Sequence, residues 1–265
     1  MKILTGEIIE NKKYGENLFK IEVFSPYICR NAAPGQFINV RCNSGVVFDP
    51  LLRRPFSIYE IDKNFNVFSI LYIVRGKGTN YLAGLKKGDI LSFIGPLGQS
   101  FKADKSYNNY LIVGGGIGVA PLCLIAKKII EEGKKVFFIA GFKDAVFYIW
   151  ERDIIKILRD YKIFTEDGSF GEKGLPTDYI KDNLQNFLDN KLVCCGPREM
   201  LVSLQEIAKR NKISADVLME ERMACGIGVC MGCAVKICSQ DGNIEYKKVC
   251  SDGPIFNLME VVFDQ

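Results

Sequence analysis

Short runs in which apolar and polar residues alternate follow one another through the first part of the chain. A strand with one buried face shows this alternation, because successive side chains point to opposite faces. Glycine and proline separate the runs, which predict strands at residues 3–9, 18–24, 37–41, 56–61, 67–74 and 90–94. Many short strands with turn residues between them are typical of a barrel. We therefore expect an antiparallel β-barrel over residues 1–102.

From about residue 109 the pattern changes to buried strands that are each followed by a helix. The predicted strands are residues 110–113, 136–140, 162–165 and 191–195, and the predicted helices are residues 120–132, 145–158, 177–187 and 198–211. This alternation is typical of a parallel sheet covered by helices, and it predicts an α/β nucleotide-binding domain over residues 103–215. A hairpin of residues 234–238 and 245–249 falls in a small C-terminal domain, residues 216–265.

Composition narrows the class of protein. With 265 residues, 48% of them hydrophobic, the chain is long enough for about two domains with real cores. The formal net charge is +4 without a long basic run, so we expect no nucleic-acid partner. No histidine is present, which excludes histidine-ligated Rieske clusters and Ser-His-Asp hydrolysis. The apolar runs are too short for a membrane span and no signal peptide is visible, so we expect a soluble cytoplasmic protein.

Four of the ten cysteines form the pattern with the most specific chemical meaning. Cys225, Cys230 and Cys233 are separated by four and two residues, and Cys250 follows after sixteen more. This C-x4-C-x2-C…C spacing is that of a plant-type [2Fe–2S] centre, in which four thiolates hold two irons. Glycines between the cysteines let backbone N–H groups approach the sulfurs. The pattern predicts these four cysteines as cluster ligands and electron transfer as the function.

Other interpretations of the cysteines remain open. A zinc knuckle or two disulfides would also use four cysteines, although zinc sites more often repeat a C-x2-C pair. Cys238 lies between the third and fourth proposed ligands and competes with Cys250 for the fourth position. We favour Cys250, because residues 249–253 are turn-like in sequence, which would let the thiolate face a cluster.

Two segments of the predicted barrel carry candidate flavin contacts. In the first, an arginine can pair with a pyrophosphate, an aromatic ring can lie against a flavin, and a hydroxyl can bond its edge. The second ends in a glycine loop that opens a short predicted helix, residues 80–85, where backbone N–H groups favour phosphate. An ordinary exposed strand start and a turn without a ligand are the alternatives. The candidate contacts are Arg54, Pro55, Phe56, Ser57, Leu71, Tyr72, Ile73, Gly78 and Thr79.

The α/β domain carries candidate nucleotide contacts where two of its strands end. Glycines after the first strand allow a nucleotide to approach the backbone, and Pro121 fits the first turn of the helix that follows. A tight turn could also explain the glycines, and Cys195 could belong to the core. The candidate contacts are Gly114, Gly115, Gly116, Gly118, Cys195, Gly196 and Pro197. Near the expected ribose, Glu166 and Asp167 lack an adjacent arginine, which favours NAD over NADP.

Taken in order, these motifs resemble the ferredoxin–NADP reductase superfamily. The resemblance rests on residues 54–57 of the barrel, residues 114–121 of the α/β domain and residues 195–197 near its end. Within the superfamily, residues 49–55, 95–98, 223–228 and 249–256 resemble the electron transfer subunits of dihydroorotate dehydrogenase B. The likeness covers essentially the whole chain.

The resemblance implies a relay of electrons in pyrimidine biosynthesis. A separate FMN-containing catalytic subunit oxidises dihydroorotate to orotate, and this chain passes the electrons through its [2Fe–2S] cluster and FAD to NAD⁺. The resemblance also implies a heterotetramer with two subunits of each kind. The proton abstraction from dihydroorotate belongs to the partner, so we expect no catalytic acid–base residue in this chain.

Two other functions share these features. A subunit of an NADPH-dependent ferredoxin oxidoreductase or sulfide dehydrogenase has the same three-part plan with another partner. A flavin and iron–sulfur redox sensor would bind a partner and turn nothing over, so its flavin would not be reduced by a nicotinamide.

Overall fold

The computed structural model describes residues 1–46, 49–147, 152–239 and 241–263, which form two compact units. The first unit consists of Met1–Phe101, Glu220–Ala234 and Lys248–Pro254, and the second of Lys102–Met219, Val235–Lys247 and Ile255–Gln265. The four cysteines of the predicted cluster therefore fall in the first unit. The predicted division at residues 102 and 215 stays a prediction, because a grouping by contacts does not show which segments fold on their own.

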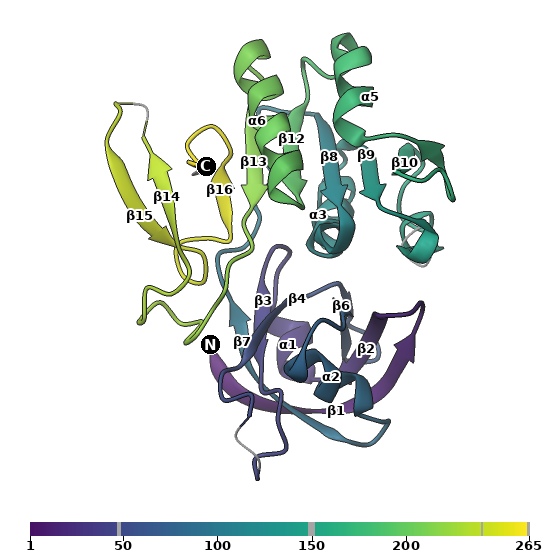
Figure 1. Ribbon diagram of the computed structural model, residues 1–265, viewed down its shortest axis with the longest axis vertical. Helices are drawn as coiled ribbons and strands as arrows, with labels where there is room; N and C mark the ends of the chain where they lie inside the picture. Colours follow the sequence, from purple (N-terminus) through teal and green to yellow (C-terminus); the bar gives the residue numbers. More distant parts are fainter. Residues whose placement is uncertain (47–48, 148–151, 240, 264–265) are drawn as a thin grey trace. The chain divides into compact units, whose positions relative to one another are not determined.

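The first unit is built on one antiparallel sheet (Figure 1). Its strands are β1 (Lys2–Lys13), β2 (Leu18–Phe24), β3 (Phe37–Val40), β4 (Arg54–Ser57), β5 (Glu60–Asp62), β6 (Val67–Ile73) and β7 (Ile90–Leu97), in the order β4-β3-β7-β1-β2-β6-β5. In β7 every second side chain is buried, as the alternation predicts. The buried side chains of Ile21, Phe68 and Phe93 belong to the core, where the rings of Phe68 and Phe93 meet edge to face at 5.5 Å.

Two hydrogen bonds close this sheet toward a barrel. The N–H of Ile58 donates to the Gln36 carbonyl (3.2 Å), beside β3, and the N–H of Tyr59 donates to the Ser69 carbonyl on β6 (2.8 Å). The chain thus passes from one edge of the sheet to the other within two residues. The single strand predicted at residues 56–61 is therefore two strands, because the backbone changes its hydrogen-bonding partner in the middle of the run.

Two helices accompany the barrel strands, and the sequence predicted only one of them. α2 (Lys77–Gly84) begins three residues before the predicted helix at 80–85. α1 (Pro26–Asn31) was not predicted; Ser25 caps it, proline occupies its first position, and Ile28 and Cys29 are its buried residues. A single helical turn has no room for a repeating apolar pattern, so only the Ser-Pro pair could have indicated it.

The second unit is an α/β layer around a largely parallel sheet (Figure 1). Its strands are β8 (Asn109–Gly115), β9 (Lys135–Phe142), β10 (Tyr161–Thr165), β11 (Glu172–Lys173), β12 (Lys191–Cys195), β13 (Ala215–Leu218) and β16 (Ile255–Asn257), in the order β11-β10-β9-β8-β12-β13-β16. Among the described strands of this sheet, only β16 is antiparallel to its neighbour. A separate hairpin pairs β14 (Ala234–Cys238) with β15 (Ile244–Lys248), as predicted within one residue.

Helices cover both faces of this sheet. The chain runs from β8 through α3 (Val119–Glu131) to β9 in one direction, and from β12 through α6 (Arg198–Asn211) to β13 in the other. Right-handed crossovers therefore place α3 and α6 on opposite faces, and α5 (Pro176–Asp182), which contacts α6, lies on the α6 face. Part of the helix predicted at residues 145–158 lies outside the described residues, and residues Ala145–Phe147 form a 3-10 turn.

The strand order fixes the place where a ligand is expected. From β8 the chain moves outward to β9 and β10 and then returns to β12 on the other side of β8. In open α/β sheets such a switch point leaves a crevice outside the carboxyl ends of the two strands. Residues 114–118, where β8 ends, and residues 195–197, where β12 ends, lie at this edge.

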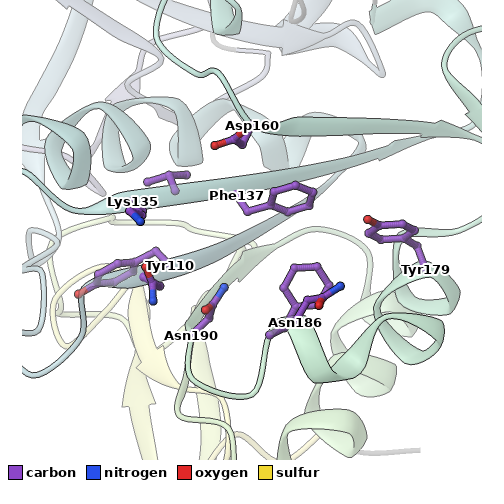
Figure 2. A pocket seen from close by; sticks show the side chains of 10 residues that line it. Tyr110, Lys135, Phe137, Asp160, Tyr179, Asn186 and Asn190 are labelled. Atoms are coloured by element: carbon purple, nitrogen blue, oxygen red, sulfur yellow. The ribbon is translucent and has the colours of Figure 1, made fainter.

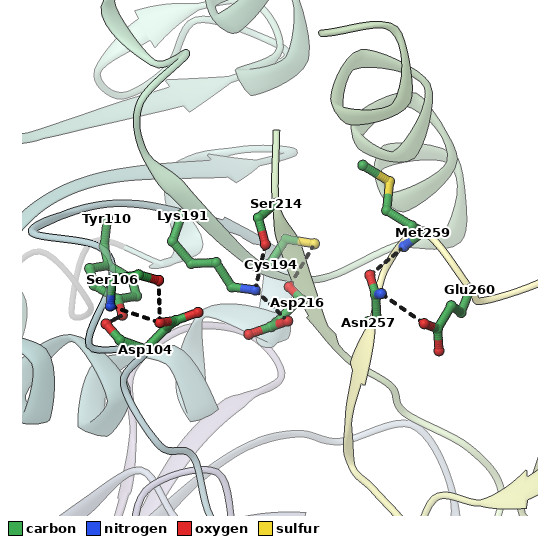
Figure 3. Close-up of polar contacts among 10 residues, drawn as sticks. All are labelled: Asp104, Ser106, Tyr110, Lys191, Cys194, Ser214, Asp216, Asn257, Met259 and Glu260. Atoms are coloured by element: carbon green, nitrogen blue, oxygen red, sulfur yellow. Dashed lines mark hydrogen bonds and ion pairs between the residues drawn. The ribbon is translucent and has the colours of Figure 1, made fainter. Parts of the chain in front are cut away.

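A partly buried ion pair joins β12 to β13 (Figure 3). Lys191 at the start of β12 donates to an Asp216 carboxylate oxygen on β13 (2.8 Å) and to the Ser214 hydroxyl (3.0 Å). Burial raises the pKa of Asp216, although the ammonium of Lys191 opposes this shift. The pair therefore stabilises the packing of β12 on β13 only while both partners are present.

No helix in the described residues is long and apolar enough to cross a membrane.

Candidate functional site

The cluster cysteines are brought together by two loops of the first unit. Cys225, Cys230 and Cys233 lie in the loop before β14, and Cys250 follows β15. The N–H of Val249 donates to the Cys233 carbonyl (3.0 Å), which places the fourth cysteine beside the third. Cys233 and Cys250 are buried, Cys225 is half-buried and Cys230 is exposed.

Backbone N–H groups surround the sulfurs. The Cys225 sulfur accepts from the N–H groups of Ile227 and Cys230 (both 3.4 Å), and the Cys250 sulfur accepts from the N–H of Gly228 (3.1 Å). Gly228 has φ +86°, a conformation that other residues rarely adopt, so glycine is needed for its N–H to reach the sulfur. Such N–H···S bonds stabilise thiolates and are the usual surroundings of iron–sulfur sulfurs.

The thiols interact in two pairs, Cys225 with Cys230 and Cys233 with Cys250. Burial alone would raise the pKa of the Cys225 thiol, but hydrogen bonds from the N–H groups of Ile227 and Cys230 and from the Cys230 thiol outweigh it and lower the pKa to about 6. Burial and the neighbouring Cys233 thiol raise the pKa of Cys250 to about 12. In the described part of the chain, no three His, Cys, Asp or Glu side chains lie close enough together to hold a single metal ion. Two thiol pairs are the donor set that the two irons of one cluster require, so these residues fit the predicted group.

Cys238 has other surroundings. It lies on β14 in the second unit, where its N–H donates to the Glu260 carbonyl (2.7 Å) and its side chain lines a cavity of about 430 Å³ with Gln205 and Met259. Its thiol contacts the Ser239 carbonyl at 3.7 Å. The pairing of Cys250 with Cys233 thus favours Cys250 as the fourth ligand, which stays a prediction.

The predicted flavin segments converge within the first unit. β4 is an edge strand and its four side chains, Arg54 to Ser57, are half-exposed and open to a ligand. The ring of Phe56 meets the ring of Tyr72 at 5.8 Å, which joins the first segment to the second. A Cβ on Gly78 would lie 3.4 Å from the Arg54 side chain, so the glycine lets the arginine lie against the start of α2.

Some of these side chains already have protein partners. Tyr72 is buried, and its hydroxyl bonds the Asn11 side chain (3.2 Å). The Thr79 hydroxyl accepts from the N–H of Gly76 (3.2 Å) and so caps α2. Leu71 is buried and Ile73 is half-buried. Tyr72 and Leu71 can therefore contact a ligand through their backbone groups and apolar surface, but not through a free polar side-chain group.

Two more arginines gather beside this site: Arg53, which precedes Arg54 in the same sequence motif, and Arg41, which the sequence did not single out. Arg53 donates to the Ser92 carbonyl (3.1 Å) and hydroxyl (3.3 Å), and both its burial and the nearby charge of Arg41 lower its pKa. Burial raises the pKa of the Cys42 thiol to about 12, although Arg54 and Arg53 oppose this shift. Neighbouring like charges are unfavourable until an anion joins them, so the cluster fits a pyrophosphate. A doubled arginine before a proline was the only available signal in the sequence.

The predicted nucleotide segments also lie side by side, within the second unit. β8 and β12 pair in parallel with Cys195 opposite Gly114. A Cβ on Gly118 would lie 2.7 Å from the Cys195 carbonyl, and a Cβ on Gly115 would lie 2.6 Å from Pro197. These two glycines are therefore required by the close approach of the two loops to each other.

At Gly116 the backbone conformation, rather than a close neighbour, favours glycine. Its φ is +54° and no atom lies within 4 Å of the place where a Cβ would be. The peptide is therefore open, as the approach of a nucleotide requires.

Cys195 is fully buried at the end of β12. In the loop after β10, the Asp167 carboxylate accepts from the N–H (2.9 Å) and hydroxyl (2.6 Å) of Ser169, which lower its pKa.

A further hollow lies at the opposite edge of the parallel sheet (Figure 2). It measures about 310 Å³ and is lined where β8 and β9 begin, by Asn109, Tyr110, Lys135, Val136, Phe137, Asp160, Tyr179, Asn186, Phe187 and Asn190. No residue predicted to bind a cofactor lines it. The cofactor segments lie at the carboxyl edge, where the strand order places a ligand.

Solved structures share the fold over nearly the whole chain. The structure of the NADH-dependent reduced ferredoxin-NADP oxidoreductase, described for flavin-based electron bifurcation, is 28% identical with a TM-score of 0.84, covering 97% of this chain and 89% of that one. Phthalate dioxygenase reductase is 16% identical with a TM-score of 0.61, covering 93% and 76%. These likenesses define the class of fold, which is that of the ferredoxin reductases.

Sequence comparisons define the family. Residues 220–262 match the iron-sulfur cluster binding domain of dihydroorotate dehydrogenase B. The dihydroorotate dehydrogenase B (NAD(+)) electron transfer subunits of Bacillus mycoides (strain KBAB4) and Bacillus cereus (strain G9842) are both 38% identical over 259 residues, covering 96% of this chain and 96% of each relative. The chain belongs to the family of dihydroorotate dehydrogenase B electron transfer subunits.

Proposed function

We propose that this chain carries electrons from an FMN-containing dihydroorotate dehydrogenase subunit to NAD⁺. The observation that carries the proposal is the placement of a four-cysteine loop and the flavin segments in one compact unit of a chain that is 38% identical to such electron transfer subunits. A bound [2Fe–2S] cluster would supply one-electron transfer and a bound FAD the change from single electrons to the hydride that NAD⁺ accepts.

The residues of the chain would hold and separate these groups. Cys225, Cys230, Cys233 and Cys250 would bind the irons. The arginines beside β4 would hold the pyrophosphate of FAD, with Phe56 and Ser57 at its edge. The open Gly116 peptide and residues 195–197 would receive the nicotinamide nucleotide. No acid–base group is needed, because the proton from dihydroorotate is removed by the partner.

A second candidate is an electron-bifurcating or NADPH-linked ferredoxin oxidoreductase subunit. The 28% identity and TM-score of 0.84 to the reduced ferredoxin-NADP oxidoreductase support it. The higher identity to the dihydroorotate dehydrogenase B relatives supports the first proposal instead. The two candidates differ in what they oxidise and in the nicotinamide they prefer.

Co-expression with a candidate FMN-containing partner subunit tests the proposal. The complex, purified without oxygen, should form NADH when dihydroorotate and NAD⁺ are added, and neither chain alone should do so. NADP⁺ should be the poorer acceptor. If the chain binds FAD and iron, is reduced by NADPH, but never couples to dihydroorotate, the second candidate replaces the first.

The partner is expected to bind over the cluster loop. Val229 and Met231 expose 76% and 48% of their surface beside Cys230, and Ile227 exposes 39%. Exposed apolar side chains around a redox centre are typical of a docking surface, because a partner that covers them removes water from the electron path.

Replacing Val229 with aspartate should weaken binding of the partner subunit by at least tenfold. A charge at the centre of an apolar interface remains without a counterion when the partner binds, which costs about 2 kcal/mol or more. The dissociation constant measured by titration calorimetry reports the change. Phe65→Asp, at a side chain that is 73% exposed on the β5–β6 turn, is the matched control and should leave the affinity as it is. Equal loss in both variants would mean that the cluster loop is not the interface.

A further inference from the structure

One buried asparagine links the flavin-bearing sheet to the cluster loop. Asn39 lies on β3, is fully buried, and stands opposite Pro55 of the flavin segment on β4. The guanidinium of Arg53 also reaches its backbone carbonyl (3.5 Å). Asn39 thus belongs to the strand that supports the predicted flavin contacts.

The two cysteine-bearing segments cover the face of β3 on which Asn39 and Phe37 lie. A Cβ on Gly98 would lie 2.8 Å from Pro254 and 3.0 Å from the Phe37 ring. The N–H of Gln99 donates to the Gly253 carbonyl (2.6 Å). The segment after Cys250 therefore packs on Gly98 and Gln99, beside the ring of Phe37, and Asn39 lies beneath the loop of Cys225.

The side chain of Asn39 makes a polar contact with the loop of Cys225. Its Nδ2 donates to the carbonyl of Cys225, the first cluster ligand, at 3.3 Å. The next residue, Gly226, has φ +69°, and a Cβ there would lie 2.5 Å from Nδ2. The amide orientation is fixed by this bond, because the flipped amide would set its oxygen against the Cys225 carbonyl.

The other half of the amide has no partner. Oδ1 of Asn39 is buried and accepts no hydrogen bond from the described residues. An unsatisfied buried acceptor lowers stability, and an apolar side chain of similar size would avoid that loss. The stability of the barrel therefore does not explain why this residue is an asparagine, and the hydrogen bond that its side chain makes in the described structure goes to the cluster ligand.

We propose that Asn39 is a positioning residue that holds the Cys225 segment on the flavin-bearing sheet and tunes the cluster through the Cys225 peptide. The inference rests on the proposed function, since it requires that the four cysteines bind a cluster. The N–H dipole of the amide lies on the Cys225 side of the site, where it favours the more negative, reduced form. The same bond keeps the N–H groups of Ile227 and Cys230 aimed at the Cys225 sulfur.

Asn39→Leu tests this role, since it removes the donor and the unsatisfied acceptor together. We expect the chain to keep its FAD, its iron content and its resistance to urea. The reduction potential of the cluster should fall, its EPR spectrum should change, and its reduction by NADH should slow about tenfold, as when the outer partners of metal ligands are removed. Gly226→Ala, which pushes the loop away from an intact Asn39, should shift the potential in the same direction, and it leaves every residue of the barrel sheet unchanged.

Asn43→Leu is the matched control. Asn43 is another buried asparagine of the same unit, but its amide is satisfied by the Pro50 carbonyl (2.8 Å), the N–H of Gly45 (3.1 Å) and the Arg41 guanidinium (3.0 Å). Its replacement should lower resistance to urea and leave the cluster EPR spectrum unchanged.

Three outcomes are distinguishable. A lower potential with retained stability in Asn39→Leu supports the inference, as does a lower potential in Gly226→Ala if Asn39→Leu does not fold. Wild-type potential and EPR spectrum in both variants would overturn it. Absence of a cluster from the unaltered chain would instead overturn the proposed function.

Discussion

Replacement of Cys250 by alanine should remove the iron–sulfur cluster from the chain, whereas replacement of Cys238 should leave it in place. Cys250 lies beside Cys233, and its sulfur accepts the Gly228 N–H at 3.1 Å. Cys238 lies on β14 in the other compact unit. A [2Fe–2S] cluster that loses one of its four thiolates loses half of the protein ligands of one iron.

Iron content and visible absorbance after anaerobic purification measure this prediction. The Cys250→Ala chain should contain almost no iron, and the Cys238→Ala chain should match the unaltered chain at about two irons. Both should keep FAD, because the flavin segments lie on the barrel sheet. Retention of the cluster in Cys250→Ala together with its loss in Cys238→Ala would contradict the ligand assignment.

Gly118→Ala should nearly abolish reduction of the flavin by NADH. The added Cβ would lie 2.7 Å from the backbone of Cys195 and 2.8 Å from the Gly196 Cα, and backbone atoms cannot avoid it by changing rotamer. The loops after β8 and β12 must therefore separate where the nucleotide is expected. We expect a loss of about 2 kcal/mol in stability of the second unit and at least a tenfold fall in the rate of flavin reduction.

Stopped-flow absorbance with NADH measures that rate, and iron and FAD content report whether the first unit is intact. Gly133→Ala is the control, because no atom lies near the Cβ position of Gly133, whose φ is positive (+77°) where that of Gly118 is −61°. It should cost about 1 kcal/mol in stability and leave the rate unchanged. A normal rate in Gly118→Ala would show that the nucleotide does not bind between these loops.

Most of the regular elements could be predicted from the sequence because their pattern is local. β2, β12 and α6 begin and end at the predicted residues, since each is a complete amphipathic or apolar run between turn residues. β13 and β16 were not predicted. They are four and three residues long, and β16 reaches its partner from the far end of the chain, so nothing local marks them.

Site residues could likewise be predicted where the signal is local in the sequence. The cysteine spacing is local, and the glycine motifs follow strands that could be recognised. Asn39 could not be predicted as part of the site, because its partner is distant: 186 residues separate Asn39 from Cys225. A single buried asparagine in a strand carries no signal until the loop that covers it is known.

The central claim is that electrons from dihydroorotate reach NAD⁺ through the cluster that this chain holds. The most direct measurement compares complexes of the FMN-containing partner with the unaltered chain and with Cys250→Ala, under anaerobic conditions. Both complexes should oxidise dihydroorotate with an artificial acceptor, and in both NADH should reduce the flavin. The account predicts dihydroorotate-dependent NADH formation by the unaltered complex and none by the Cys250→Ala complex. Equal NADH formation by a Cys250→Ala complex that lacks iron would contradict it.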